Sequence, residues 1–121
     1  MTRINCGIPV QELTDKHLLA EHREIKRIPN AIKSGRYNMA HQPTIFTLGT
    51  GHVKFFYDKL GYLFKRYCKL YEECKHRGFN ITNFKSAWDD LPDNMMKDYL
   101  PTDDDKQIIR NRIKEKNKDD E

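Results

Sequence analysis

The chain has 121 residues, of which 37% are hydrophobic and 33% are charged, so it can form one modest core beneath a well-hydrated surface. No apolar run is long enough for a transmembrane helix, and the polar start Met1-Thr2-Arg3-Ile4-Asn5 argues against a signal peptide. The three cysteines form no Cys-x-x-Cys pair, which favours a reducing, cytoplasmic setting.

The formal net charge of +4 is unevenly distributed along the chain. Residues 14–37 contain six basic and three acidic side chains, residues 52–78 contain seven and three, and residues 79–105 contain two and seven. Segregation of this kind suits a surface that binds a polyanion such as nucleic acid. Basic helices are also common on proteins that have no such partner, so charge alone leaves both interpretations open.

Residues 1–13 are predicted to form an extended arm, because Gly7 and Pro9 oppose a helix there. The small side chain of Thr2 is compatible with removal of Met1, which would leave a free α-amine on Thr2. An α-amine has a pKa of about 7.7–8.0, well below the lysine value of about 10.4, so part of it is a nucleophile near neutral pH. Schiff-base chemistry with a sugar aldehyde needs that nucleophile. Many proteins begin Met-Thr without using the amine, which is the simpler interpretation.

The next segment, residues 15–34, is predicted to be a helix that is capped by Thr14 or Asp15 and ends at Gly35. Pro29 predicts a kink in the turn that precedes it. Helical spacing places four aliphatic side chains in one stripe that should face the core: Leu18, Ile25, Ile28 and Ile32.

The border of that stripe carries the candidate catalytic group, Glu24, together with His17. Arg23 and Arg27 lie one turn apart on another face. A carboxyl at such a border is a candidate acid or base, because desolvation disfavours its charged form while guanidinium groups favour it. The alternative is a solvated surface ion pair worth under about 1 kcal/mol. The spacing of His17 and His22 differs from that of helical zinc ligands, so no metal is expected.

Residues 36–51 are predicted to be a loop that leads into a second helix. The loop ends Gly49-Thr50-Gly51-His52, and backbone amides beside glycine at a helix start bind phosphate readily. The segment lacks the Lys-Ser/Thr ending and the preceding strand of a nucleotide-binding loop. Gly51 and His52 are therefore either DNA-phosphate ligands or a plain turn into a helix.

The second helix has the clearest period and is predicted to end at Gly78. Its apolar positions recur at alternating spacings of four and three: Phe56, Leu60, Leu63, Tyr67, Leu70 and Cys74. Trp88 is expected to fill the core. A third helix should begin at Thr102, with three aspartates in its first turn, and residues 116–121 should be a frayed charged tail. These elements predict an all-α fold, one compact domain of three main helices over residues 1–115 with irregular connecting loops.

Several separate blocks of sequence then stand out in order: Met1–Asn5, His17–Leu18, Ala20–Glu21, Arg23–Glu24 with Arg27, Leu48–Val53, Phe55–Leu60 and Arg77–Ile81. In these blocks the chain resembles the pyrimidine-dimer DNA glycosylases, the small endonuclease V enzymes of T-even phages. The resemblance implies a compact helical enzyme, both DNA glycosylase and abasic-site lyase, that works without a metal or cofactor. We expect a monomer that acts on lesion-containing double-stranded DNA, away from membranes, in a bacterial or phage-infected cell.

The resemblance also implies roles for individual residues. Thr2, freed of Met1, would attack C1′ of the damaged nucleotide's sugar, and Glu24 would stabilise the developing sugar cation. A Schiff base and then β-elimination would cut the strand on the 3′ side. DNA phosphates would be held by Arg3, His17, Arg23 and Arg27. Excision of ultraviolet pyrimidine dimers is the expected activity. The alternatives are the same chemistry on another damaged or modified base, and a non-catalytic module that binds distorted DNA.

Overall fold

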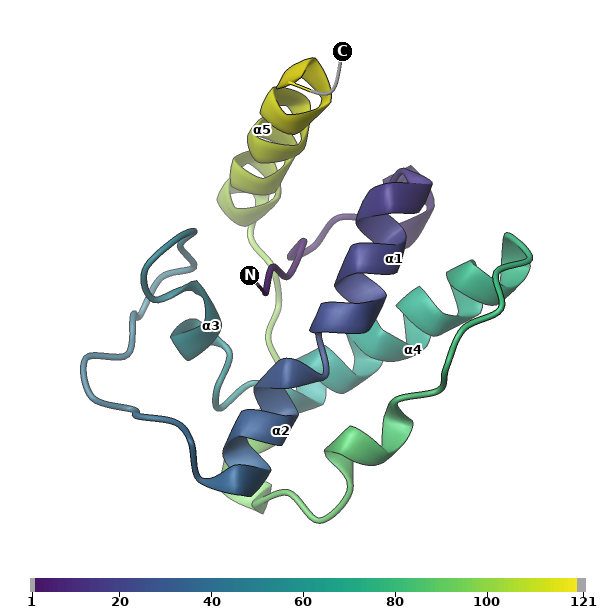
Figure 1. Cartoon of the computed structure of the whole chain (residues 1–121). Coiled ribbons are helices and arrows are strands. Elements are labelled where there is room, and N and C mark those ends of the chain that lie inside the picture. Colours follow the sequence, from purple (N-terminus) through teal and green to yellow (C-terminus); the bar gives the residue numbers. More distant parts are fainter. Residues whose placement is uncertain (1, 120–121) are drawn as a thin grey trace.

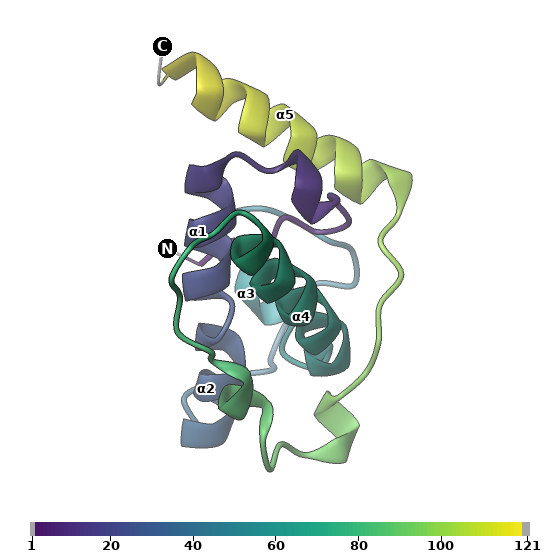
Figure 2. The ribbon, with the colours of Figure 1, turned by 90° about the vertical axis from the view of Figure 1, so that its right-hand side faces the viewer.

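The computed structural model describes residues 2–119, with side-chain surroundings for residues 2–115. The regular elements in that range are all helical, which confirms the predicted all-α class. The α-helices are α1 (Asp15–Glu24), α2 (Arg27–Ser34), α3 (His52–Phe55), α4 (Leu60–His76) and α5 (Asp103–Asp119). Short 3-10 helices are η1 (Val10–Glu12), η2 (Lys85–Trp88) and η3 (Asp93–Met95). Figure 1 shows α1 packed beside α4, and Figure 2 shows α5 lying across one end of the molecule.

The predicted first helix is divided into α1 and α2 by a turn at residues 25–26. Pro29 has no N–H to donate to the Ile25 carbonyl, so the helical hydrogen bonds are interrupted in the turn before it. The Ile28 N–H donates to that carbonyl instead, at 3.3 Å. Thr14 caps α1 as predicted. The predicted apolar stripe is buried along its whole length, at Leu18, Ile25, Ile28 and Ile32.

The predicted second helix is also divided, into α3 and α4, by a turn at residues 56–59. This turn is attached to the segment before α5, since the Lys97 N–H donates to the Asp58 carbonyl at 3.1 Å. Gly61 allows the backbones to approach, because a Cβ there would lie 2.5 Å from the Met96 carbonyl oxygen. The predicted period is confirmed by burial of Phe56, Leu60, Leu63, Tyr67, Leu70 and Cys74.

The third helix, α5, continues to Asp119 and so extends further than predicted. Thr102 caps it as expected, and Asp105 completes a reciprocal capping box: the Asp105 N–H donates to Thr102 Oγ1 at 3.1 Å, and the Thr102 N–H donates to Asp105 Oδ2 at 3.0 Å. Its last turns consist largely of residues with high helix propensity. The predicted tail at residues 116–121 therefore begins as helix, and residues 120–121 lie outside the described range.

The N-terminal arm belongs to the core, because Ile4 and Ile8 are 0% and 1% exposed. Full burial of one such side chain contributes about 1.5–3 kcal/mol. Figure 1 shows the arm passing between α1 and α5, and Ile109 of α5 is completely buried. Trp88 is buried as predicted. Within residues 2–119, no helix combines the length and the apolar character that a membrane span requires.

Candidate active site

A buried histidine fixes the arm two residues after Thr2. The Ile4 N–H donates to Nε2 of His52 at 2.9 Å, and Nδ1 of His52 lies 2.8 Å from the Thr47 carbonyl oxygen. These two partners require the neutral tautomer with its proton on Nδ1. Burial lowers the pKa of His52, and the charge of Arg3 lowers it further. The ring is therefore a neutral acceptor near neutral pH.

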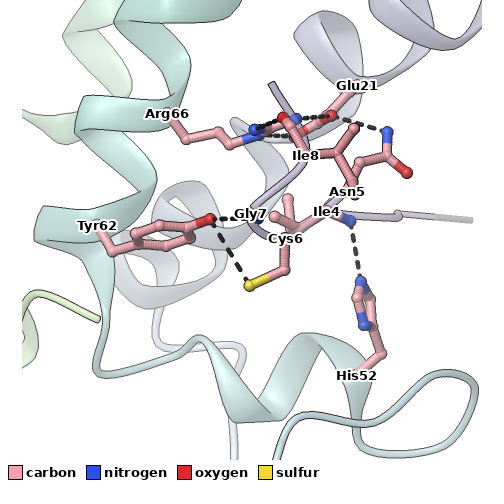
Figure 3. A network of polar contacts seen from close by, with 9 residues as sticks. All are labelled: Ile4, Asn5, Cys6, Gly7, Ile8, Glu21, His52, Tyr62 and Arg66. Carbon is pink, nitrogen blue, oxygen red and sulfur yellow. Dashed lines mark hydrogen bonds and ion pairs between the residues drawn. The ribbon is translucent and has the colours of Figure 1, made fainter. Parts of the chain in front are cut away.

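A buried ion pair holds the following residues of the arm. Glu21 on α1 accepts from Asn5 Nδ2 at 2.8 Å and from Arg66 Nε and Nη2 at 2.6 and 2.9 Å. Nη1 of Arg66 donates to the Ile8 carbonyl at 2.6 Å. Glu21 and Arg66 are only 2% and 6% exposed. Bidentate, charge-assisted bonds are strong, so the arm is clamped between α1 and α4 (Figure 3).

A tyrosine on α4 provides a further anchor for the arm. The Gly7 N–H donates to the Tyr62 hydroxyl at 3.1 Å, and that hydroxyl donates to Cys6 Sγ at 3.6 Å. Burial raises the pKa of the Cys6 thiol to about 12, so Cys6 is not a nucleophile near neutral pH. Gly7 has a φ of 78°, and a Cβ there would lie 2.7 Å from Pro101 Cβ, so the arm has little room to shift.

The anchored arm places Arg3 where its side chain interacts with Glu24. Glu24 follows Glu21 by about one turn of α1, a rise of roughly 4.5 Å along the axis. The Arg3 side chain interacts electrostatically with Glu24. Burial lowers the pKa of Arg3, and the charge of Glu24 partly offsets this effect by raising it. Thr2 is half-buried. Because three residues span at most roughly 10 Å, Thr2 lies within that distance of the Asn5 backbone.

Glu24 occupies the border position that helical spacing predicted. Its side chain is 14% exposed, whereas the side chain of Arg23 is 60% exposed, and the two are 3.5 Å apart at Oε2 and Nη2. A contact of this length to an exposed arginine adds little to holding the carboxylate in place. Arg27 is exposed at the start of α2, and His17 is half-buried on α1. A carboxylate that is mostly shielded, beside solvent-facing guanidinium groups, suits chemistry on a polyanion.

A comparison with protein-family models decides the family. The model described as pyrimidine dimer DNA glycosylase matches residues 1–87. The chain belongs to this family. The match covers the arm and all of α1 to α4, and therefore includes Thr2, Glu24, His52 and Arg66. The resemblance is confirmed, and family membership implies a DNA substrate.

At Gly51 and His52 the structure has a turn into α3 in which the histidine side chain faces the interior. His52 is 3% exposed, and both of its ring nitrogens are bound inside the protein. Gly51 has a φ of 91°, and a Cβ there would lie 2.9 Å from Pro43 Cγ. Helix α3 has only four residues. These two residues thus form the turn that holds the arm, because the histidine is needed as an acceptor in the interior.

Sequence reasoning missed a basic residue of this glycosylase that lies near the site. Arg112 on α5 interacts electrostatically with Arg3, and its charge is the second cause, after burial, of the lowered pKa of Arg3. Arg112 makes a loose contact with Glu115, at 3.7 Å. The helical period could have indicated Arg112, because Arg112 follows the apolar residue Ile109, which is buried, by about one turn of the helix. Across the described residues, no group of three or more His, Cys, Asp or Glu could hold a metal ion.

Proposed function

We propose that this protein excises pyrimidine dimers from DNA and cuts the strand as an abasic-site lyase, with the α-amine of Thr2, freed of Met1, as the nucleophile. The observation that carries the proposal is the anchored arm. Its bonds from Ile4 to His52 and from Asn5 to Glu21 fix the backbone just after Thr2, on the side of α1 where Arg3 interacts with Glu24. The family match supports the glycosylase activity.

In the proposed reaction, the unprotonated amine of Thr2 attacks C1′ of the damaged nucleotide. The N–C1′ bond forms as the glycosidic bond breaks, and the bonding electrons leave with the base, which takes up a proton. The Glu24 carboxylate stabilises the positive charge that develops on the sugar. An α-amine suits this role because its pKa of about 7.7–8.0 leaves part of it unprotonated near neutral pH.

Strand cleavage follows from the covalent adduct. Opening of the sugar ring produces an imine between the Thr2 nitrogen and C1′, and the imine acidifies the proton on C2′. Loss of that proton and of the 3′ phosphate by β-elimination breaks the strand on the 3′ side. Water then hydrolyses the imine and releases the amine. Glu24 is the nearby group that assists these proton transfers, as a carboxylate that alternately accepts and donates a proton.

The basic residues around Glu24 supply the DNA contacts in this proposal. Exposing a glycosidic bond within duplex DNA costs a few kcal/mol of unstacking. Contacts from exposed guanidinium groups to phosphates offset that cost and hold the duplex without reading its sequence. Arg23 and Arg27 are exposed on α1 and α2, and Arg3 on the arm interacts electrostatically with both Glu24 and Arg112 of α5.

A plasmid assay tests the proposed activity. Ultraviolet-irradiated supercoiled plasmid should be nicked, undamaged plasmid should not, and irradiated plasmid repaired beforehand by a cyclobutane-dimer photolyase should resist nicking. Failure to nick irradiated DNA would contradict the proposed glycosylase and lyase activity. Nicking that survives photolyase treatment would contradict the pyrimidine dimer as substrate.

A further inference from the structure

Among the hydrogen bonds that hold the arm within the described residues, the bond from Ile4 to His52 lies nearest to Thr2 along the chain. Asn5 and Gly7 are held further along the arm, by Glu21 and Tyr62. Any displacement of Ile4 is therefore transmitted to Thr2 through a single intervening residue. Figure 3 shows the His52 ring approaching the arm from a different side than Tyr62 and Arg66.

The surroundings of His52 make its ring a rigid acceptor. The rings of Phe46 and Phe56 meet it edge to face, with centroids 5.4 and 5.6 Å away, and the Thr47 carbonyl fixes Nδ1. The charged groups that face it are Arg3 on the arm and Glu21 on α1, and Glu21 is already bound by Arg66. Protonation would replace the lone pair on Nε2 with an N–H and break the bond to Ile4.

The chemistry depends on where the arm is held. Attack on C1′ requires the amine within a few tenths of an ångström of its productive place, and a displacement of about 1 Å can cost about a hundredfold in rate. Arg3 lies on the arm, but two of the proposed DNA contacts, Arg23 and Arg27, are exposed on α1 and α2, so most of the DNA affinity should not depend on the contact between Ile4 and His52.

We propose that His52 is a positioning residue of this glycosylase: as a neutral acceptor for the Ile4 N–H, it sets the place of the Thr2 α-amine relative to the Glu24 carboxylate. The proposal rests on the proposed nucleophilic role of Thr2. It assigns to His52 an effect on the rate of imine formation that is separate from DNA binding.

Two substitutions test the roles of the two ring nitrogens separately. In His52→Gln, the amide oxygen reaches the place of Nε2 and can accept from Ile4, whereas the shorter side chain of His52→Asn reaches only the place of Nδ1 and leaves the Ile4 N–H unpaired. The rate of borohydride-trapped adduct formation on a duplex with an abasic site is measured in single turnover. Affinity is measured on a duplex with a tetrahydrofuran abasic analogue, which cannot form an imine.

We expect His52→Asn to slow adduct formation about tenfold or more while the Kd stays within about twofold, and His52→Gln to recover most of the rate. Equal rates for wild type and His52→Asn, equal losses in both variants, or a Kd that weakens in step with the rate would each overturn the inference. If wild type itself forms no adduct, the proposed function fails. A normal wild-type adduct with an unimpaired His52→Asn variant removes only the role of His52.

Nuclear magnetic resonance of wild-type protein with 15N-labelled histidine tests the inference even if a variant does not fold. His52 should show the neutral tautomer with its proton on Nδ1, and its titration should coincide with loss of protection of the Ile4 amide from hydrogen exchange. A ring that carries its proton on Nε2, or an Ile4 amide that stays protected after His52 is protonated, would overturn the inference.

Discussion

The carboxylate of Glu21 on α1 and the guanidinium of Arg66 on α4 form a bidentate pair at 2.6 and 2.9 Å in the interior of the protein. The pair is more than a link between two helices, because each member also binds the arm, Glu21 through Asn5 and Arg66 through Ile8. The same buried charges that join α1 to α4 therefore determine where the N-terminal residues lie (Figure 3).

Glu21→Gln should lower the free energy of unfolding by about 3–5 kcal/mol, because it leaves the buried Arg66 guanidinium without its counter-charge. Urea unfolding monitored by circular dichroism measures the change. Asp15→Asn is the matched control on α1, since Asp15 pairs with Arg77 at 3.0 Å but its side chain is 69% exposed, and it should cost at most about 1 kcal/mol. Equal losses in the two variants would contradict a structural role for the buried pair.

Stability should fall as the pH falls below about 6.5, because two buried histidines stay neutral in the folded state. Burial lowers the pKa of His22, with a further contribution from Lys26, and burial also lowers that of His52. The unfolded chain binds protons at the usual histidine value of about 6.5. The stabilisation that the two neutral histidines contribute is thus complete above that pH, and it is lost as the pH falls through their lowered pKa values in the folded state.

His22→Phe tests the pH effect, because phenylalanine keeps an aromatic ring stacked against Tyr67, where the centroids are 5.5 Å apart, and removes the titrating group. Urea unfolding between about pH 7.5 and pH 5.5 should show a shallower loss of stability in this variant than in wild type. Identical slopes for the two proteins would show that His22 takes no part.

The helices were predictable because their signals are local. Helical spacing identified the buried faces of α1, α2 and α4, and Thr14 and Thr102 were recognisable as caps. The divisions of the first two predicted helices were harder to predict. Pro29 indicated one of them, but the turn at residues 56–59 depends on contacts with Lys97, which is remote in sequence.

The site was predictable only in part, for a related reason. Glu24 could be placed at a polar–apolar border by spacing alone, and the structure has it there. The structural role of Glu21 was not predicted, since its partner Arg66 lies 45 positions away. For His52 the sequence left two interpretations open, a phosphate ligand or a plain turn into a helix, because sequence does not show that the arm supplies an N–H to its ring.

Glu24→Gln should abolish excision of pyrimidine dimers more completely than it reduces cutting at a preformed abasic site. The neutral amide cannot stabilise the sugar cation that forms as the base leaves, whereas an abasic site has no base to lose. Rates on irradiated duplex and on abasic duplex give the comparison, with Glu72→Gln, an exposed glutamate on α4, as control. Equal losses on both substrates would mean that Glu24 has a structural role only.

Arg23→Ala and Arg27→Ala should weaken binding to irradiated and undamaged DNA alike, and each should make the slope of log K against log salt shallower by about 0.9 if one phosphate contact is lost. Titrations at several salt concentrations measure the slope. Lys69→Ala is the matched control, because Lys69 is also an exposed cation but belongs to α4 and not to the proposed DNA-binding face on α1 and α2. Lys69 borders a groove of about 790 Å³ near residues 98–101. Slopes that change equally in all three variants would contradict a DNA-binding face on α1 and α2.

Reduction with borohydride during reaction on abasic-site DNA, followed by peptide mass mapping, tests the central claim most directly. The protein should first be shown by intact mass to have lost Met1. The account predicts one covalent protein–DNA adduct, located on the α-nitrogen of Thr2 and prevented by selective acetylation of that amine. An adduct located on a lysine, or an adduct yield that survives acetylation of Thr2, would contradict it.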